Sequence, residues 1–211
     1  MSLRLYSYWR SSAAYRVRIA LNLKELDYEI VPVSLAPGVA EHRGEAYRAK
    51  NPQMLVPYLE DGELGIAQSM AILEYLEEAY PGMHLLPQSE PARSQVRAFC
   101  NMIACDIHPL NNLRVMNYIK KEFDADPTGD WYTHWVNEGF RAAEAIASDG
   151  PYVFGANVTL ADAFLVPQVY NARRFKVPLD DFPKLVAATN ACNELTAFQD
   201  AAPEAQSDAS A

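Results

Sequence analysis

The chain has 211 residues, of which half are hydrophobic and about a fifth are charged, so it can bury a core and is not disordered as a whole. Its 27 acidic residues exceed its 18 basic ones, giving a net charge of −9. This balance argues against general nucleic-acid binding and against adhesion to an anionic membrane surface. No apolar run approaches the ~18 residues of a membrane span, and the first residues lack the apolar stretch of a signal peptide.

The cysteines and histidines indicate neither a disulfide framework nor a metal site. Cys100, Cys105 and Cys192 are odd in number and form no CxxC pair, which favours reduced thiols in a cytoplasmic protein. The four histidines are scattered without metal-ligand spacing, so we predict no metal.

The first third of the chain reads as mixed α/β. Residues 3–8 read as a strand, and apolar residues three or four apart predict a helix over 12–24, with Ser11 or Ser12 as its N-cap. Residues 28–33 read as a second strand, which Pro32 places at a sheet edge because proline cannot donate to a ladder. A short helix is expected near 41–49.

A hairpin and a closing helix follow. Residues 56–60 and 64–67 read as two strands joined at Asp61-Gly62. Ser69 is expected to cap a helix that ends before Tyr80-Pro81-Gly82. The order β-α-β, then β-β-α, is that of a thioredoxin-like domain, which we expect over residues 1–82.

The rest of the chain reads as helices. Residues 83–91 contain two prolines and read as a linker, and residues 92–211 are expected to form an all-helical domain with a frayed tail from about 203. A long helix is expected over 93–119, bent near His108-Pro109. Further helices are expected over 131–148, from a capping-box-like pattern at Thr159 and Asp162 to 175, and after Pro183.

Four segments resemble one protein family. They are RSSAAYRVRIAL at 10–21, QS at 68–69 with EYLEE at 74–78, IHPLNNLR at 107–114, and LVPQVYNARRF at 165–175. The first closely resembles the signature of zeta-class glutathione transferases, also called maleylacetoacetate isomerases, and the likeness covers nearly the whole chain. Ala13 departs from the pattern, since many members have Cys there.

The resemblance implies glutathione as cofactor, and the residues suit that chemistry. A serine hydroxyl at a helix start can donate to a thiolate, and lowering a thiol pKa from ~8.5 to about 6.5 needs ~2.7 kcal/mol. A charge-assisted hydrogen bond of ~1.5–3 kcal/mol and a helix N-terminus of ~0.3–1 kcal/mol are of that size. Family alignment favours Ser11 for this role, with Ser12 in support. The local sequence alone favours two ordinary N-capping serines, and the match over the whole chain favours the thiolate-binding role instead.

Other residues complete the implied glutathione site. Val56-Pro57 resembles the cis-proline turn whose backbone pairs with the cysteinyl part of glutathione. The dipeptide alone favours an ordinary trans proline that opens an edge strand, because cis is the minority form. Backbone N–H groups at Gln68-Ser69 suit the γ-glutamyl carboxylate. By resemblance alone, the pocket is completed by His42, His108 and Asn112.

Three arginines fall in these motifs of an acidic chain. Arg10, Arg114 and Arg174 can bind the carboxylates of a dicarboxylate substrate, because guanidinium pairs with carboxylates in a bidentate way. Arg10 is also expected to stabilise negative charge during the reaction. A solvated surface charge is the alternative for each one. Arg16 and Arg18 are expected to be structural.

The implied reaction is glutathione-dependent cis–trans isomerisation of maleylacetoacetate to fumarylacetoacetate, a step of tyrosine and phenylalanine catabolism, by a cytoplasmic homodimer. The nearest alternative is maleylpyruvate isomerase, which performs the same chemistry on a shorter acyl chain. An alternative from another class is a non-catalytic binding module with the glutathione-transferase fold. A conjugating or dehalogenating side activity is compatible with either enzyme.

Overall fold

The computed structural model describes residues 3–209 and divides the chain into two compact units. The first holds the residues up to His84 together with those from Leu195 onward, and the second is Leu85–Glu194. The first contains a four-stranded sheet and the second is helical, which confirms the expected fold class. No helix among the described residues is both long and apolar enough to cross a membrane.

The sheet of the first unit has the predicted thioredoxin-like topology. Its strands are β1 (Leu3–Ser7), β2 (Tyr28–Pro32), β3 (Tyr58–Asp61) and β4 (Leu64–Ala67), in the order β2-β1-β3-β4. β1 is parallel to β2 and antiparallel to β3, and β3 is antiparallel to β4. Pro32 therefore lies on an edge strand, as expected, where its missing N–H costs no central ladder bond.

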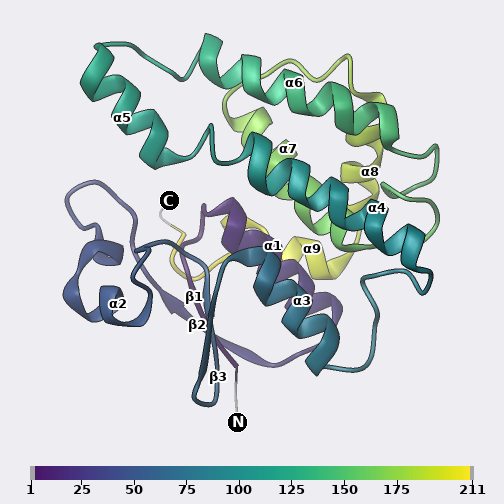
Figure 1. Cartoon of the computed structure of the whole chain (residues 1–211), viewed down its shortest axis with the longest axis horizontal. Coiled ribbons are helices and arrows are strands. Elements are labelled where there is room, and N and C mark those ends of the chain that lie inside the picture. Colours follow the sequence, from purple (N-terminus) through teal and green to yellow (C-terminus); the bar gives the residue numbers. More distant parts are fainter. Residues whose placement is uncertain (1–2, 210–211) are drawn as a thin grey trace. The chain divides into compact units, whose positions relative to one another are not determined.

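Alternate side chains of β1 build the cores on the two faces of the sheet. Leu3 and Leu5 pack with residues of α1 (Ser12–Leu23) and α3 (Ser69–Ala79). Tyr6 points to the opposite face and packs with Tyr47 of α2 (Glu45–Lys50). Figure 1 accordingly shows α1 and α3 side by side on one face and α2 on the other. This two-residue alternation is the strand periodicity expected from the sequence.

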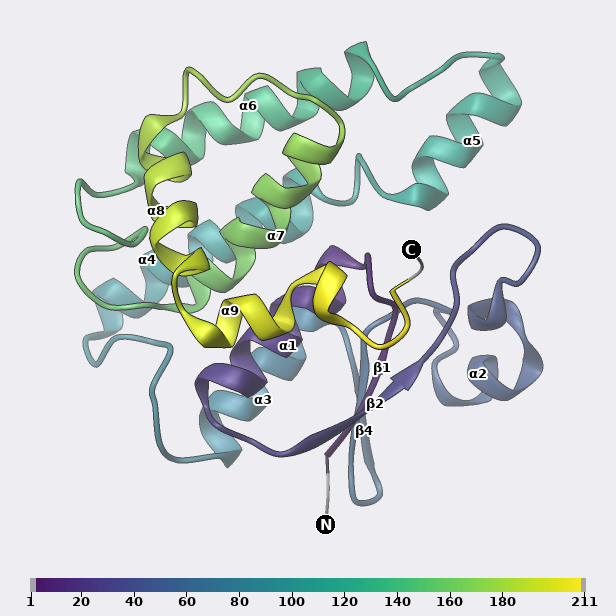
Figure 2. The same cartoon turned by 180° about the vertical axis from the view of Figure 1, so that it is seen from behind.

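The carboxyl-terminal segment corrects the expected division of the chain, which placed residues 92–211 in one helical domain. Helix α9 (Thr196–Ala201) runs beside α1 of the first unit, as both Figures 1 and 2 show. Its Phe198 and Ala201 are fully buried. The expected frayed tail is instead ordered in a 3₁₀ turn, Pro203–Ala205, followed by a buried Gln206. Residues 1–2 and 210–211 lie outside the described residues.

The second unit is built around one buried helix. Its helices are α4 (Glu90–Asn101), α5 (Leu113–Phe123), α6 (Asp130–Ile146), α7 (Leu160–Arg174) and α8 (Pro183–Asn193). All ten residues of α7 from Leu160 to Val169 are buried, so the helix is enclosed on every side rather than amphipathic. The capping box predicted at its start is present: Asp162 accepts hydrogen bonds from the N–H groups of Thr159 and Val153, both at 2.8 Å.

The long helix expected over residues 93–119 is interrupted rather than bent. α4 continues into a π-helical turn, Met102–Ile107, and a non-helical turn separates it from α5 at Leu113. Pro109 lies in this turn and has no N–H to continue the helical ladder. Helix α4 also begins at Glu90, inside the expected linker.

Candidate active site

The register of the sheet brings four predicted segments to one end of it. Ser7, the last residue of β1, lies opposite Pro32, the last of β2. Tyr58, the first residue of β3, lies opposite both Tyr6 and Ala67. The turns that follow β1, β2 and β4, and the one that precedes β3, must therefore share this end. Ser11 follows β1, and the loop that leads to His42 follows β2. Val56-Pro57 precedes β3, and Gln68-Ser69 follows β4.

Ser11 is the N-cap of α1. Its Oγ accepts a hydrogen bond from the N–H of Ala14 at 3.2 Å, and its own N–H donates to the carbonyl of Tyr8 at 2.9 Å. Because the capping bond uses an oxygen lone pair, the hydroxyl proton is left to donate elsewhere. Ser11 is half-buried, whereas Ser12 is only 5% exposed. Accessibility to a ligand therefore favours Ser11.

The peptide bond between Val56 and Pro57 is cis, as the family resemblance implied and the dipeptide alone did not. The preceding loop is organised by α2 and its C-cap: Tyr47 Oη and Asn51 Nδ2 both donate to the carbonyl of Leu55, at 2.7 and 2.8 Å. Burial raises the pKa of Tyr47 to about 12, so it remains a neutral donor. Two side chains thus fix the backbone immediately before the cis bond.

Gln68 and Ser69 form the start of α3, but not in the expected manner. Ser69 is not the N-cap; Gln68 holds that position with no capping side-chain bond, and its φ of 73° is rare for a residue with a side chain. Ser69 Oγ instead accepts a hydrogen bond from Nη1 of Arg16 at 3.2 Å, and both residues are buried. Arg16 therefore connects the starts of α1 and α3, a role that its position in the signature did not reveal.

His42 and Arg10 lie on the same unit. His42 is half-buried, and its Nδ1 lies 3.3 Å from the carbonyl oxygen of Ser34 in the loop after β2. Arg10 is exposed, with its guanidinium 4.5 Å above the ring of Trp9. Its Nη2 donates to Tyr8 Oη at 3.4 Å, and a guanidinium stacked in this way keeps its other donors available.

The remaining predicted residues belong to the second unit. His108 is half-buried and follows the π-helical turn, and Asn112 is the N-cap of α5, accepting from the N–H of Arg114 at 2.9 Å. Arg114 itself is exposed. His108 and Asn112 thus lie at the two ends of one turn, and Arg114 lies in the first turn of α5.

The start of α6 brings that turn near Arg174. Asn111 Nδ2 donates to the carbonyl of Tyr132 at 3.4 Å, and the Tyr132 ring stacks on Phe175 at 4.0 Å. The Arg174 guanidinium lies 4.9 Å from the same Phe175 ring. Burial raises the pKa of Tyr132, and the nearby charge of Arg174 opposes this shift. Tyr132 and Phe175 thus connect the two arginine-bearing segments of this unit.

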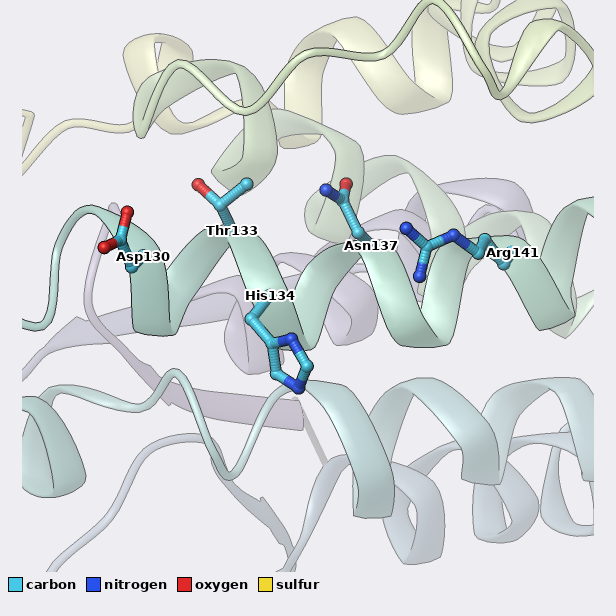
Figure 3. A pocket seen from close by; sticks show the side chains of 5 residues that line it. All are labelled: Asp130, Thr133, His134, Asn137 and Arg141. Atoms are coloured by element: carbon cyan, nitrogen blue, oxygen red, sulfur yellow. The ribbon is translucent and has the colours of Figure 1, made fainter.

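Two hollows lie outside these residues. One of about 400 Å³ lies on the α2 face of the sheet, between Tyr6, Tyr47 and Lys50. The other, of about 290 Å³, runs along α6 (Figure 3), where His134 projects to the side of the helix away from Thr133 and Asn137. Neither is lined by a residue predicted for the site, so the candidate site rests on the convergence of turns within each unit.

Comparison with known proteins decides the family. Models of the glutathione S-transferase N-terminal and C-terminal domains match residues 1–78 and 130–190. A maleylpyruvate isomerase of a Ralstonia species is 47% identical over 98% of this chain and 99% of its own length. A probable maleylacetoacetate isomerase of Vibrio cholerae is also 47% identical, over 99% of both chains. The chain belongs to the maleylacetoacetate isomerase family, the zeta class of glutathione transferases.

Solved structures of zeta-class and isomerase relatives have the same fold. A zeta-class maleylpyruvate isomerase in its holo form gives a TM-score of 0.94 at 46% identity, covering 98% of this chain and all of that one. A maleylacetoacetate isomerase of Anaeromyxobacter dehalogenans gives 0.88 at 40% identity, covering 99% and 94% of the two chains. Dicarboxyethyl glutathione and citrate are bound in its active site.

The N-cap position and accessibility of Ser11 lead to a prediction for the isomerase. Replacing Ser11 with Ala should lower turnover about 10- to 100-fold, the loss expected for one hydrogen bond to a charged thiolate, and change glutathione affinity much less. Steady-state kinetics and a glutathione titration check this. Ser89→Ala is a matched control, since Ser89 caps α4 through the same kind of bond. If Ser12→Ala lowers turnover and Ser11→Ala does not, the assignment of Ser11 is wrong.

Proposed function

We propose that this protein is a glutathione-dependent cis–trans isomerase that converts maleylacetoacetate to fumarylacetoacetate in tyrosine and phenylalanine catabolism. The observation that carries the proposal is the convergence, at one end of the sheet, of an accessible serine at a helix start, a cis Val56-Pro57 bond and a second helix start at Gln68-Ser69. The family membership supports each of these roles.

Glutathione would be held at its two ends by two helix starts. Ser11 donates to the thiolate, and the N-terminus of α1 adds a favourable dipole. The γ-glutamyl carboxylate binds at the N-terminus of the 11-residue helix α3, beside Ser69. Because Ser69 Oγ accepts from Arg16, its proton is directed away from Arg16 and can be donated to the carboxylate. Val56 is proposed to pair with the cysteinyl backbone, and His42 is proposed as a further glutathione-binding residue. His108 and Asn112 are proposed for the same role from family membership alone.

The chemistry is an addition followed by an elimination. The thiolate sulfur adds to one carbon of the cis double bond, forming a C–S bond and moving the π electrons onto the conjugated carbonyl as an enolate. The former double bond is now single and rotates. The enolate then re-forms the double bond as trans, the C–S bond breaks, and the thiolate is released. No proton or electron is consumed, so glutathione is recovered.

Two substrates are candidates. The ligand bound to the Anaeromyxobacter relative is glutathione carrying a dicarboxyethyl group, the type of adduct that a thiolate forms with an unsaturated dicarboxylate. Maleylacetoacetate is such a dicarboxylate and is our first candidate. Maleylpyruvate is the second, favoured by the 47% identity with the Ralstonia maleylpyruvate isomerase and by the holo structure of the zeta-class enzyme.

The stoichiometry of glutathione tests the proposal. Both substrates, offered side by side with a trace of glutathione, should give many product molecules per glutathione lost, because the elimination step returns the thiol. Product and remaining thiol are measured together. Loss of one glutathione per product would identify a conjugating transferase instead. Glutathione binding without turnover of either substrate would support the non-catalytic binding module.

The exposed arginines are proposed to bind the substrate carboxylates. Among residues 3–209, neither Arg10, Arg114 nor Arg174 forms an ion pair with an acidic side chain, although the chain has an excess of acids. Guanidiniums that stay unneutralised in an acidic protein suit a dianionic substrate. Arg10, which precedes Ser11 and stacks on Trp9, is also proposed to stabilise the enolate charge.

Each of these arginines should matter for the substrate and not for glutathione. Arg→Ala variants of Arg10, Arg114 and Arg174 should raise KM or lower turnover about tenfold or more, since losing a carboxylate partner costs ~2–5 kcal/mol. Lys should rescue only in part because it lacks the two-pronged contact. Arg173→Ala is the control, because the neighbouring Arg173 is held by Asn190. Three variants with unchanged kinetics would reject the dicarboxylate site.

We also propose that the enzyme acts as a cytoplasmic homodimer. Three cysteines without a CxxC pair suit a reducing compartment. The dimer is inferred from family membership. Sedimentation of the purified protein tests the dimer, and a monomer at working concentrations would reject it.

A further inference from the structure

Trp9 lies in the turn between β1 and α1, two residues before Ser11. Its N–H donates to Oδ2 of Asp208 at 3.0 Å, and its carbonyl accepts from Nη2 of Arg18 at 3.0 Å. The peptide groups on both sides of Trp9 are therefore held by side chains. Because the Ser11 N–H bonds back to the carbonyl of Tyr8, displacing Trp9 would displace Ser11 as well.

Arg18 is fully buried and joins three segments. Besides the Trp9 carbonyl, its guanidinium donates to Ser7 Oγ at 3.0 Å and to the carbonyl of Ala201 in α9 at 2.9 Å. Burial lowers its pKa to about 10, so the group remains charged at neutral pH. Charged donors make stronger hydrogen bonds than neutral ones. The three hydrogen bonds of Arg18 therefore fix the end of β1 against the carboxyl-terminal segment.

The course of the carboxyl-terminal segment is fixed independently of Asp208. Asn22 Nδ2 of α1 donates to the carbonyl of Ala197 at 3.0 Å, and Gln206 Nε2 donates to the carbonyls of Asp200 and Ala202, each at 2.9 Å. These bonds lead the chain from α9 to the Ser11 turn, where Figure 2 shows the end of the described chain beside the segment between β1 and α1. Asp208 is thus brought to Trp9 by an ordered segment.

We propose that Asp208 is a positioning residue: together with Arg18 it holds the Trp9–Ser11 turn so that the Ser11 hydroxyl meets the glutathione thiolate. This role deepens the proposed function and depends on it. The carboxyl-terminal segment would then serve the thiolate end of the site although it is distant from Ser11 in sequence.

Two substitutions of Asp208 separate its hydrogen bond from its charge. Asp208→Ala removes the acceptor and should lower kcat about fivefold, the change that one hydrogen bond of typical strength produces, while the dissociation constant of glutathione changes little. Asp208→Asn keeps an acceptor oxygen and should restore most of the turnover. Asp200→Asn, an exposed acid on α9, is the control and should behave as wild type. Hydrogen exchange of the Trp9 amide should be faster in the Ala variant alone.

A purely structural contact gives a different pattern. If the Trp9 amide exchanges faster in Asp208→Ala while kcat equals that of the control, the positioning role is rejected. If wild-type protein fails to isomerise either substrate, the proposed function fails, and the ultraviolet absorbance of bound glutathione thiolate then tests Asp208 alone. Less thiolate in the Ala variant than in the Asn variant, at one pH, supports the role, and equal amounts overturn it.

Discussion

The site depends on the register of β1 with its two neighbours. Pairing Ser7 with Pro32, and Tyr6 with Tyr58, aligns the ends of the strands so that their turns meet at one end of the sheet. A slip of one residue would move Leu5 out of the core shared with α1 and α3, and would turn Tyr6 away from Tyr47. The same burial that stabilises the sheet therefore fixes the distance between the start of α1 at Ser11 and the start of α3 at Ser69.

Helix α1 adds a second constraint through two buried arginines. Arg16 reaches the start of α3 through Ser69, and Arg18 reaches the Trp9 carbonyl and α9. The two arginines are two residues apart and face in different directions. Arg16 supports the carboxylate end of the proposed glutathione site, and Arg18 supports its thiolate end. Buried guanidiniums are costly unless hydrogen-bonded, so their partners are held firmly in return. An acidic protein thereby keeps positive charge where an anionic tripeptide is to bind.

Local patterns predicted most of the first unit, and contacts between distant segments account for what they missed. The strands, the N-cap at Ser11 and the edge position of Pro32 follow from spacing and residue chemistry, and the family resemblance supplied the cis bond at Val56-Pro57. The cap at Ser69 was wrong because Arg16, 53 residues away, engages its hydroxyl instead. The frayed tail was wrong because small polar and Ala-rich sequences look flexible until their partners are known. Here Gln206 donates back to the carbonyls of Asp200 and Ala202, and Asp208 accepts from the N–H of Trp9. Proline indicated a bend at Pro109, but the π-helical turn and full break before α5 leave no simple sequence signal.

The central claim is that one end of this sheet holds glutathione between two helix starts, with its sulfur at Ser11. A crystal structure of the protein with glutathione tests this most directly. The account predicts the sulfur within hydrogen-bond distance of Ser11 Oγ, and the γ-glutamyl carboxylate on the N–H groups at the start of α3 beside Ser69. Glutathione bound with its sulfur at Ser12, or away from this end of the sheet, would contradict it.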